Sequence, residues 1–187
     1  MAKGATGSRK VSVDDWIDAG YALLAEAGIE ALKLDRLCAH LGVTKGSFYW
    51  HFTDMAAYRT ALVRAWAELR DRDRSGFGEL SGLAPRDRLA TMMAALRAER
   101  QRALERAMRE WARTEPAVAD SVRAADHKVV AAVRRAFQDA GFDRDEADMR
   151  ANATFAAGIG FLHLSDAPSG ARLAAQQERF LDVMLTP

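Results

Sequence analysis

The segment from Leu34 to Phe52 constrains the fold of this 187-residue chain more than any other, and it has the sequence LDRLCAHLGVTKGSFYWHF. Its three leucines recur at helical spacing, which predicts a short helix with a single buried stripe. Gly42 follows at once, at the point where a helix C-terminus favours a residue that tolerates a left-handed backbone. Thr44 then occupies the N-cap position of a second helix, because its hydroxyl can accept a hydrogen bond from a free backbone N–H.

Two short helices joined by such a turn form a helix-turn-helix, whose second helix can enter the major groove of DNA. Its exposed positions carry side chains that hydrogen-bond or stack: Thr44, Lys45, Ser47, Tyr49 and Trp50. Phe48 and Phe52, four residues apart, are predicted to point back into the core. The segment therefore predicts a small domain that binds double-stranded DNA.

Together with the helix before it and the helix after it, this segment resembles the DNA-binding domain of the TetR (tetracycline-repressor) family of transcriptional regulators. In that family a long first helix ends in Ala-Gly, and a signature close to G-V-S-x-G-x-x-Y-x-H-F follows. This chain has Ala27-Gly28 and then, from Gly42 to Phe52, GVTKGSFYWHF. Thr44 replaces the usual Ser with the same capping chemistry. The resemblance covers roughly the first third of the chain.

Two positions depart from the family pattern. The family commonly has a phosphate-contacting Lys in the first turn of the fourth helix, whereas this chain has Met55. The residue that opens the second helix is often Thr, whereas here it is Lys33, which cannot accept a capping hydrogen bond. Asp35, just inside that helix, favours the positive end of the helix dipole instead.

The resemblance implies a set of DNA-contacting residues: Lys33, Arg36, Thr44, Lys45, Gly46, Ser47, Tyr49, Trp50 and His51. Contacts to phosphate are expected to outnumber contacts to bases, because most protein–DNA hydrogen bonds go to the backbone. Gly46 would let the helix approach the bases closely. Trp50 would either stack on the sugar-phosphate backbone or pack against the protein.

The charge of the chain does not by itself indicate nucleic-acid binding. The net charge is +1, and residues 1–53 carry six Lys or Arg against six Asp or Glu. DNA affinity must therefore depend on where the cations lie, in particular on Lys45, Lys33, Arg36 and the pair Arg9-Lys10. Cys38, the one cysteine, excludes an internal disulfide and fits a reducing cytoplasm. It is expected to pack in the core rather than to sense redox state.

The pattern of the remaining chain predicts an all-α protein, with an N-terminal three-helix helix-turn-helix domain followed by a C-terminal helical domain. The resemblance implies that the C-terminal helical domain binds a ligand and dimerises. We expect a flexible basic arm over residues 1–10, the DNA-binding domain over 11–56 and the helical domain over 57–187. A fourth helix is predicted from about Asp54 until a charged, Gly-rich linker begins at Asp71 and ends at Pro85. A turn is predicted over Pro168–Gly170. The N-terminus lacks a secretory signal, and no apolar run approaches the ~20 residues of a membrane span, so we expect a cytoplasmic location without membrane contact.

The segment Ala151–Leu164 is apolar or small almost all round, which predicts that one face packs on the core while another meets a partner. With the helix that follows the Pro168–Gly170 turn, it could form a four-helix interface with its two-fold copy, as the family resemblance also implies. The predicted interface residues are Ala153, Ala157, Gly158, Phe161, Leu162, Phe180 and Leu181.

Several bulky side chains of the C-terminal helices are candidates for a pocket that binds an apolar or aromatic effector. They are Trp66, Met92, Met93, Leu96, Met108, Trp111, Phe137, Phe155 and His163. For any single one of these residues, plain core is the favoured explanation of a Met and aromatic stripe at helical spacing. His163 could instead lie at the dimer seam. His127 and His163 lie on separate helices without a nearby Cys or His, so no metal site and no cofactor are predicted.

The favoured interpretation is a homodimeric, ligand-responsive regulator rather than an enzyme, since no catalytic motif is present. The resemblance implies a repressor that leaves a palindromic operator when a small-molecule effector binds. Two alternatives remain open at this point: a helical small-molecule-binding dimer with vestigial DNA binding, and an interaction adaptor that docks through the aromatic cluster Phe48–Phe52.

Overall fold

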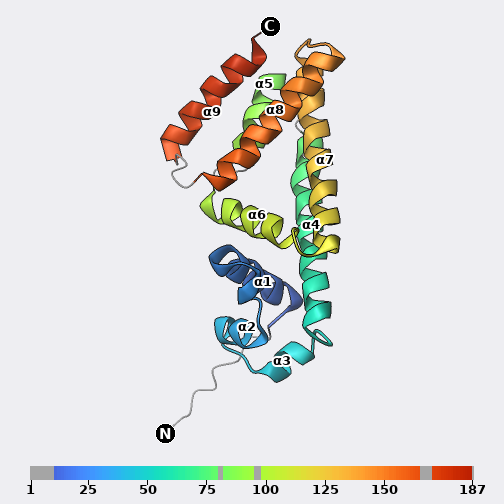
Figure 1. Ribbon diagram of the computed structural model, residues 1–187, viewed down its shortest axis with the longest axis vertical. Helices are drawn as coiled ribbons and strands as arrows, with labels where there is room; N and C mark the ends of the chain where they lie inside the picture. The colour runs from blue at the N-terminus through green and yellow to red at the C-terminus, as the bar shows by residue number, and fades with distance from the viewer. Residues whose placement is uncertain (1–10, 80–81, 95–97, 165–169, 187) are drawn as a thin grey trace. The chain divides into compact units, whose positions relative to one another are not determined.

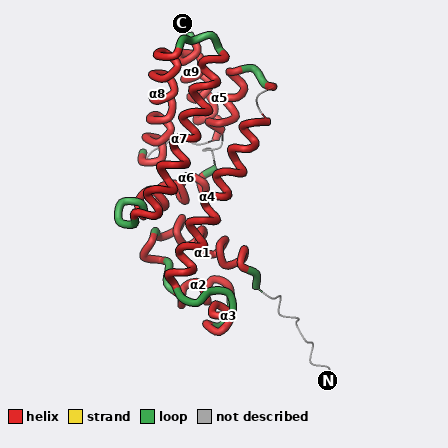
Figure 2. The backbone as a smooth tube through the Cα atoms, turned by 90° about the vertical axis from the view of Figure 1, so that its right-hand side faces the viewer, coloured by secondary structure: helices red, strands yellow, loops and turns green. Residues whose placement is uncertain are grey.

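The computed structural model describes residues 11–79, 82–94, 98–164 and 170–186, and within these ranges the protein consists of helices and loops without a strand (Figures 1 and 2). In chain order the elements are α1 (Val13–Ala27), the short 3₁₀ helix η1 (Ile29–Ala31), α2 (Leu34–Leu41), α3 (Lys45–Tyr49), α4 (Met55–Glu79), α5 (Pro85–Ala94), α6 (Glu99–Trp111), α7 (Pro116–Asp139), α8 (Arg144–His163) and α9 (Gly170–Leu185). The predicted all-α fold is confirmed. The predicted basic arm, Leu96 and most of the Pro168–Gly170 turn lie outside the described residues.

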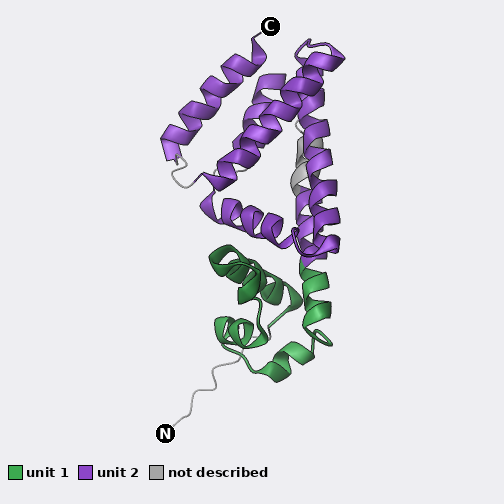
Figure 3. Ribbon diagram, viewed as in Figure 1, with its two compact units in different colours: residues 1–62 green, residues 63–187 purple. Residues whose placement is uncertain are grey.

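The chain divides into two compact units, one ending at Leu62 and the other beginning at Val63 (Figure 3). This division falls inside α4, whereas the sequence predicted a domain boundary after residue 56. The reason is that Tyr58 and Leu62, on the first turns of α4, are fully buried in the N-terminal unit. α4 is therefore one continuous helix that belongs to both units.

An aromatic cluster forms the core of the N-terminal unit. The Phe48 ring lies 5.3 Å from Trp16, 5.3 Å from Phe52 and 5.6 Å from Tyr58, measured between ring centroids. Tyr58 Oη donates a hydrogen bond to the carbonyl of Trp16 at 2.9 Å, so α4 is joined to α1. Burial raises the pKa of Tyr58 well above its ordinary value, which keeps this hydroxyl protonated as a donor. A Cβ on Gly20 would lie 2.1 Å from Tyr58 Oη, so this close approach requires glycine.

Local sequence determines where α1 begins and where α2 ends. α1 begins with a capping box, in which Ser12 Oγ accepts from the Asp15 N–H while Asp15 accepts from the Ser12 N–H at 2.8 Å. At the end of α2, Gly42 adopts a left-handed backbone with φ 67°. The Gly42 and Val43 N–H groups then donate to the carbonyls of Ala39 and Cys38, the two hydrogen bonds of a Schellman motif. The predicted turn between the two short helices is thus confirmed.

The C-terminal unit is a bundle in which α7 and α8 run antiparallel, joined by a short loop, and α5, α6 and α9 pack around them (Figure 1). Its main core cluster draws side chains from α5, α7, α8 and α9: Leu89, Val133, Ala136, Phe137, Ala147, Ala151 and Leu181. Polar contacts add to this packing. Gln177 of α9 donates to the Met93 carbonyl at 3.1 Å, and Arg106 of α6 donates to the Leu162 carbonyl at 3.1 Å.

The predicted end of the fourth helix near Asp71 is wrong, because α4 continues to Glu79. Charged residues do not stop a helix when they lie on its solvated side. Asp71 and Arg72 are exposed, and Asp71 pairs with Lys128 of α7 at 2.6 Å. None of the described helices is long and apolar enough to cross a membrane.

Candidate DNA-binding face and effector cavity

α3 presents two aromatic side chains to solvent while a third anchors it. Tyr49 and Trp50 are 58% and 72% exposed, whereas Phe48 is completely buried in the aromatic cluster. Thr44, Lys45 and Gly46, at the start of the helix, are also exposed. The structure therefore groups most of the predicted DNA contacts on one short helix that is held rigidly from behind.

Thr44 occupies the predicted N-cap position with extended backbone, but its hydroxyl makes no capping hydrogen bond. The first turn is closed by the backbone instead, since the Ser47 N–H donates to the Thr44 carbonyl at 3.0 Å. The expected side-chain cap is thus wrong in this detail. The hydroxyl remains at the surface, beside Lys45.

Lys45 is engaged in an ion pair that the sequence did not reveal. Its Nζ lies 2.6 Å from Asp35 Oδ1, so the two helices of the motif are joined through solvent-exposed side chains. The hydrogen bond to Asp35, followed by the negative charge of that residue, raises the pKa of Lys45 above its ordinary value. Lys45 therefore carries its charge throughout the physiological pH range, and Asp35 competes with any phosphate for it.

His51 makes a contact within the unit. Its Nε2 lies 2.9 Å from the Val11 carbonyl, and because a carbonyl only accepts, Nε2 is the donor. This bond ties the end of α3 to the chain just before α1. His51 is half-buried, so one ring nitrogen is committed to the protein rather than to the surface.

At the other end of the motif, Lys33 and Arg36 are exposed on the first turn of α2. Lys33 occupies the N-cap position without a side-chain capping bond, as its chemistry requires. Met55 opens α4 and is half-buried, so it supplies packing where the family commonly has a cation.

A cavity of about 500 Å³ lies inside the C-terminal unit, among α4, α5, α6, α7 and α8. Four predicted ligand-binding residues line it: Trp66, Met92, Met93 and Phe155. Its volume is in the range of about 300–1,000 Å³ that is usual for small-molecule sites. The sequence alone could not distinguish such a cavity from a filled core, because both need the same apolar side chains.

The other predicted ligand-binding residues that the structure describes do not line this cavity. Met108, Trp111 and Phe137 are buried in the helix packing, which is the plain-core alternative. His163 is exposed at the end of α8. A helical stripe identifies the buried face of each helix, but the space between faces depends on how all the helices meet.

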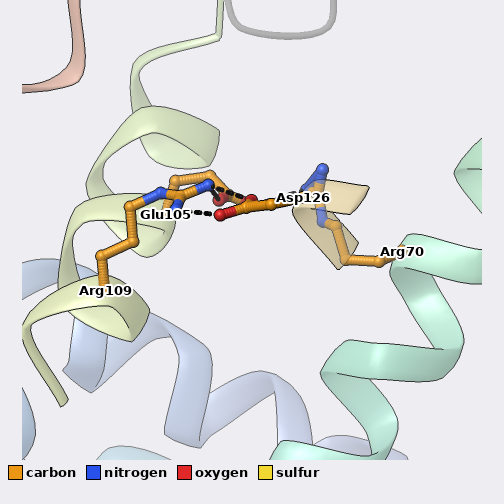
Figure 4. A network of polar contacts seen from close by, with 4 residues as sticks. All are labelled: Arg70, Glu105, Arg109 and Asp126. Atoms are coloured by element: carbon orange, nitrogen blue, oxygen red, sulfur yellow. Dashed lines mark hydrogen bonds and ion pairs between the residues drawn. The ribbon is translucent and has the colours of Figure 1, made fainter. Parts of the chain in front are cut away.

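A network of four charged residues forms part of the cavity wall, and no sequence motif predicted it (Figure 4). Arg109 of α6 donates to both oxygens of Asp126 of α7, at 2.7 and 2.9 Å, and lies 3.7 Å from Glu105. Arg70 of α4 lies 3.2 Å from Glu105. Burial lowers the pKa of Arg109, but the hydrogen bonds to Asp126 and the two carboxylate charges raise it overall. The spacing of Glu105 and Arg109, four residues apart on one helix, was the single available signal.

The N-terminal segment matches the family model for bacterial regulatory proteins of the tetR family over residues 17–61. Residues 17–61 therefore form a domain of the TetR-family type. The matched model describes regulatory proteins, in agreement with the prediction that the chain is not an enzyme. No curated protein sequence matches the chain.

Solved structures share the fold over nearly the whole chain. GusR of Salmonella enterica has a TM-score of 0.68 and 23% identity, and the match covers 95% of this chain and 99% of that one. A transcriptional regulator from Rhodococcus sp. Rha1 has a TM-score of 0.73 and 22% identity, with 94% of each chain covered. A transcriptional regulator from Saccharomonospora viridis in complex with choline has a TM-score of 0.69 and 17% identity, covering 92% and 94%. These likenesses show that the C-terminal unit shares its fold with these solved structures as well.

Two of the seven predicted dimer residues are covered within the single chain, four are half-buried and one is exposed. Leu162 and Leu181 are fully buried, the latter in the main core cluster. Ala157, Gly158, Phe161 and Phe180 line a second cavity of about 190 Å³. Ala153 is exposed on α8. Ala153 shares the exposed outer face of α8 with three residues that were not predicted at the interface: Met149, Ala156 and Gly160.

Proposed function

We propose that this protein is a homodimeric transcriptional regulator that binds a palindromic operator through α3 and leaves it when a small apolar effector occupies the cavity. In this proposal it acts as a repressor. The observation that carries the proposal is the pairing of the two sites on one chain. A TetR-type domain presents exposed Lys45, Tyr49 and Trp50, and the C-terminal unit encloses a cavity of ligand size.

α4 supplies the physical connection between the two sites. Tyr58 and Leu62, near its start, are buried in the DNA-binding unit, while Trp66 and Arg70, two turns later, line the cavity. An effector that contacts Trp66 and Arg70 therefore acts on the helix that anchors the DNA-binding unit. It weakens DNA binding only if it binds more tightly to the conformation that cannot bind DNA. The choline complex of the S. viridis regulator supports a small-molecule role for a unit of this fold.

DNA binding is tested by fluorescence anisotropy with the DNA that flanks the gene, over a series of salt concentrations. Lys45→Ala is expected to weaken binding roughly tenfold and to reduce the salt slope by about one, because one phosphate contact is lost. Tyr49→Ala is expected to weaken binding without a comparable change in slope, because it removes a neutral contact.

Lys128→Ala is the matched control for Lys45→Ala. Lys128 is also an exposed lysine paired with an aspartate at 2.6 Å, but it lies in the C-terminal unit. Its replacement should leave operator affinity unchanged. If Lys45→Ala and Tyr49→Ala both bind DNA as the unaltered protein does, α3 is not the recognition helix. A helical ligand-binding dimer with vestigial DNA binding would then be favoured.

The proposed dimer forms through the outer face of α8. Met149, Ala153, Ala156 and Gly160 recur at intervals of four, three and four residues, which places them in one exposed apolar stripe. Small side chains at three of these positions let a partner helix approach closely. A two-fold axis then presents two recognition helices to half-sites about 34 Å apart, one turn of DNA.

Gly160→Arg tests this interface, and sedimentation velocity measures the result. A Cβ at Gly160 meets no atom within 4 Å in the single chain, so the fold should tolerate the substitution. The arginine should block the partner helix and shift the protein to monomer. Ala124→Arg, on an exposed position of α7, should remain dimeric. If the Gly160→Arg protein stays dimeric, the interface does not lie on this face of α8.

A further inference from the structure

The wall of the 500 Å³ cavity carries buried hydrogen-bond donors that have no partner among the described residues. They are Trp66 Nε1, Gln101 Nε2, Arg109 Nε and Thr154 Oγ1. Trp66 is 1% exposed and Thr154 is 7% exposed, so neither is open to bulk solvent. The indole N–H, the NH₂ of the amide and the guanidinium N–H can only donate, and the threonine hydroxyl can donate.

Buried polar groups in folded proteins are nearly always hydrogen-bonded, because an unmet donor loses its bonds to water without compensation. Four such donors on residues of one cavity wall indicate what the cavity is built to receive. A complementary ligand must bring a hydrogen-bond acceptor. The rest of the wall is apolar, with Met92, Val129, Phe155 and Ile159 among its members, so the body of that ligand must be apolar as well.

The charges of the wall indicate whether that acceptor is ionised. Arg70 and Arg109 face Glu105 and Asp126, so the charges of the described wall residues sum to zero. Asp126 already accepts two hydrogen bonds from Arg109, and Glu105 lies within 4 Å of both arginines. A ligand ammonium would find each carboxylate already neutralised, and it would face the unmet N–H donors.

A ligand carboxylate would suit the donors, but it would leave one buried negative charge without a compensating cation. The penalty for an uncompensated buried charge exceeds the extra strength of a charged hydrogen bond over a neutral one. A carbonyl oxygen in an uncharged molecule meets the donors and keeps the wall neutral.

We infer that the effector is an uncharged, mainly apolar molecule with a carbonyl-type acceptor, an amide, ester, lactone or ketone, which accepts from the donors that Thr154, Gln101 and Trp66 contribute to the wall. This inference rests on the proposed function, since it names the effector class of the proposed regulatory site. Thr154 also lines the second cavity, together with Met93, Gly158 and Leu162, so a long apolar body can extend from the first cavity toward the second.

The test compares three probes with the same ten-carbon chain: N,N-dimethyldecanamide, decanoate and decyltrimethylammonium. Isothermal titration calorimetry of the full-length protein measures each affinity directly, without DNA. The amide, which has an acceptor but no donor, is expected to bind at least about tenfold more tightly than either ion, as an unpaired buried charge implies. Equal or tighter binding of decanoate or of the ammonium probe overturns the inference, and so does absence of amide binding.

Two variants then locate the acceptor. Thr154→Val keeps the side-chain shape and removes the hydroxyl, and should weaken amide binding about fivefold, the value of one ordinary hydrogen bond. Thr91→Val is the matched control, because the Thr91 hydroxyl also lies on a wall residue but already donates to the Asp87 carbonyl at 2.8 Å. If Thr154→Val lowers the melting temperature of the protein, the amide affinity of Gln101→Leu provides a second test of the site. Unchanged amide affinity in both Thr154→Val and Gln101→Leu overturns the assigned site.

The outcomes for the effector class and for the proposed function are separable. Operator binding is measured on the same preparations before any probe is added. A protein that binds the amide but not DNA would fail as a regulator while the effector class stands. A protein that binds DNA but prefers a charged probe would overturn the effector class, while the proposed DNA binding would stand.

Discussion

The two units of this protein handle buried polar groups in opposite ways. In the N-terminal unit, the hydroxyls of Tyr21 and Tyr58 donate to backbone carbonyls, and Trp16 Nε1 is the one buried side-chain donor or acceptor without a partner among the unit's described residues. In the C-terminal unit, buried nitrogen or oxygen atoms of Trp66, Gln101, Arg109 and Thr154 lack partners among the described residues, and these four residues line a cavity. One unit has a filled core, and the other keeps space for a ligand.

This difference fits the proposed function. A DNA-reading helix needs a rigid support, which an aromatic core around Phe48 provides. A ligand-responsive unit must retain interactions that only the ligand completes, and such groups lower the stability of the empty form. Three predictions compare the two units, from the largest expected effect to the smallest.

Phe48→Ala should destabilise the N-terminal unit by about 3–5 kcal/mol, because it empties the centre of the aromatic cluster. The loss is measured by urea unfolding followed by circular dichroism, and operator binding should disappear with it. Phe155→Ala is the control in the other unit, where the side chain is half-buried on the cavity wall. Its cost should be clearly smaller, because that space is already incompletely filled. Equal costs would contradict the contrast between a filled and an open core.

Asp126→Ala should cost about 2–3 kcal/mol, since it leaves Arg109 partly buried with only the more distant Glu105 as a partner. The double variant Arg109→Leu and Asp126→Leu should recover most of this stability, because an apolar pair avoids desolvating two charges. Thermal unfolding of the single and double variants gives the comparison. A double variant as unstable as the single one would show that the network holds α6 and α7 together.

Asp35→Asn should strengthen operator binding by up to about fivefold, because it removes the carboxylate that competes with phosphate for Lys45. The effect is small because both side chains are exposed. Asp71→Asn, which breaks the equivalent pair with Lys128, should leave DNA affinity unchanged. Weaker binding by Asp35→Asn, at unchanged stability, would mean that Asp35 positions Lys45 for DNA instead of competing with it.

Local features of the N-terminal unit could be predicted because neighbouring residues determine them. Gly42 adopts the left-handed turn, Phe48 and Phe52 are buried, and Lys33 leaves the start of α2 without a side-chain cap. The pairing of Lys45 with Asp35 and the contact of His51 with Val11 could not be predicted. They depend on how two helices and a preceding segment meet in space.

In the C-terminal unit the predictions identified the helices and their buried faces, but they could not separate side chains that line a cavity from side chains that fill the core. Met108, Trp111 and Phe137 share the periodicity of Trp66 and Met92, yet they fill the core while the other two face the cavity. Leu162 and Leu181 were predicted at a dimer interface and are covered within the chain. Periodicity shows which face of a helix is apolar and says nothing about what covers that face.

The sequence by itself therefore determined the helical fold, the helix-turn-helix with its turn, and the exposed residues offered to DNA, because capping chemistry and helical spacing act over a few residues. Only the tertiary structure decided where the cavity lies and which groups line it. It brought Arg70, Glu105, Arg109 and Asp126 together from three helices (Figure 4). Charges and donors scattered along a sequence become a site only when packing removes them from water and sets them a few ångströms apart.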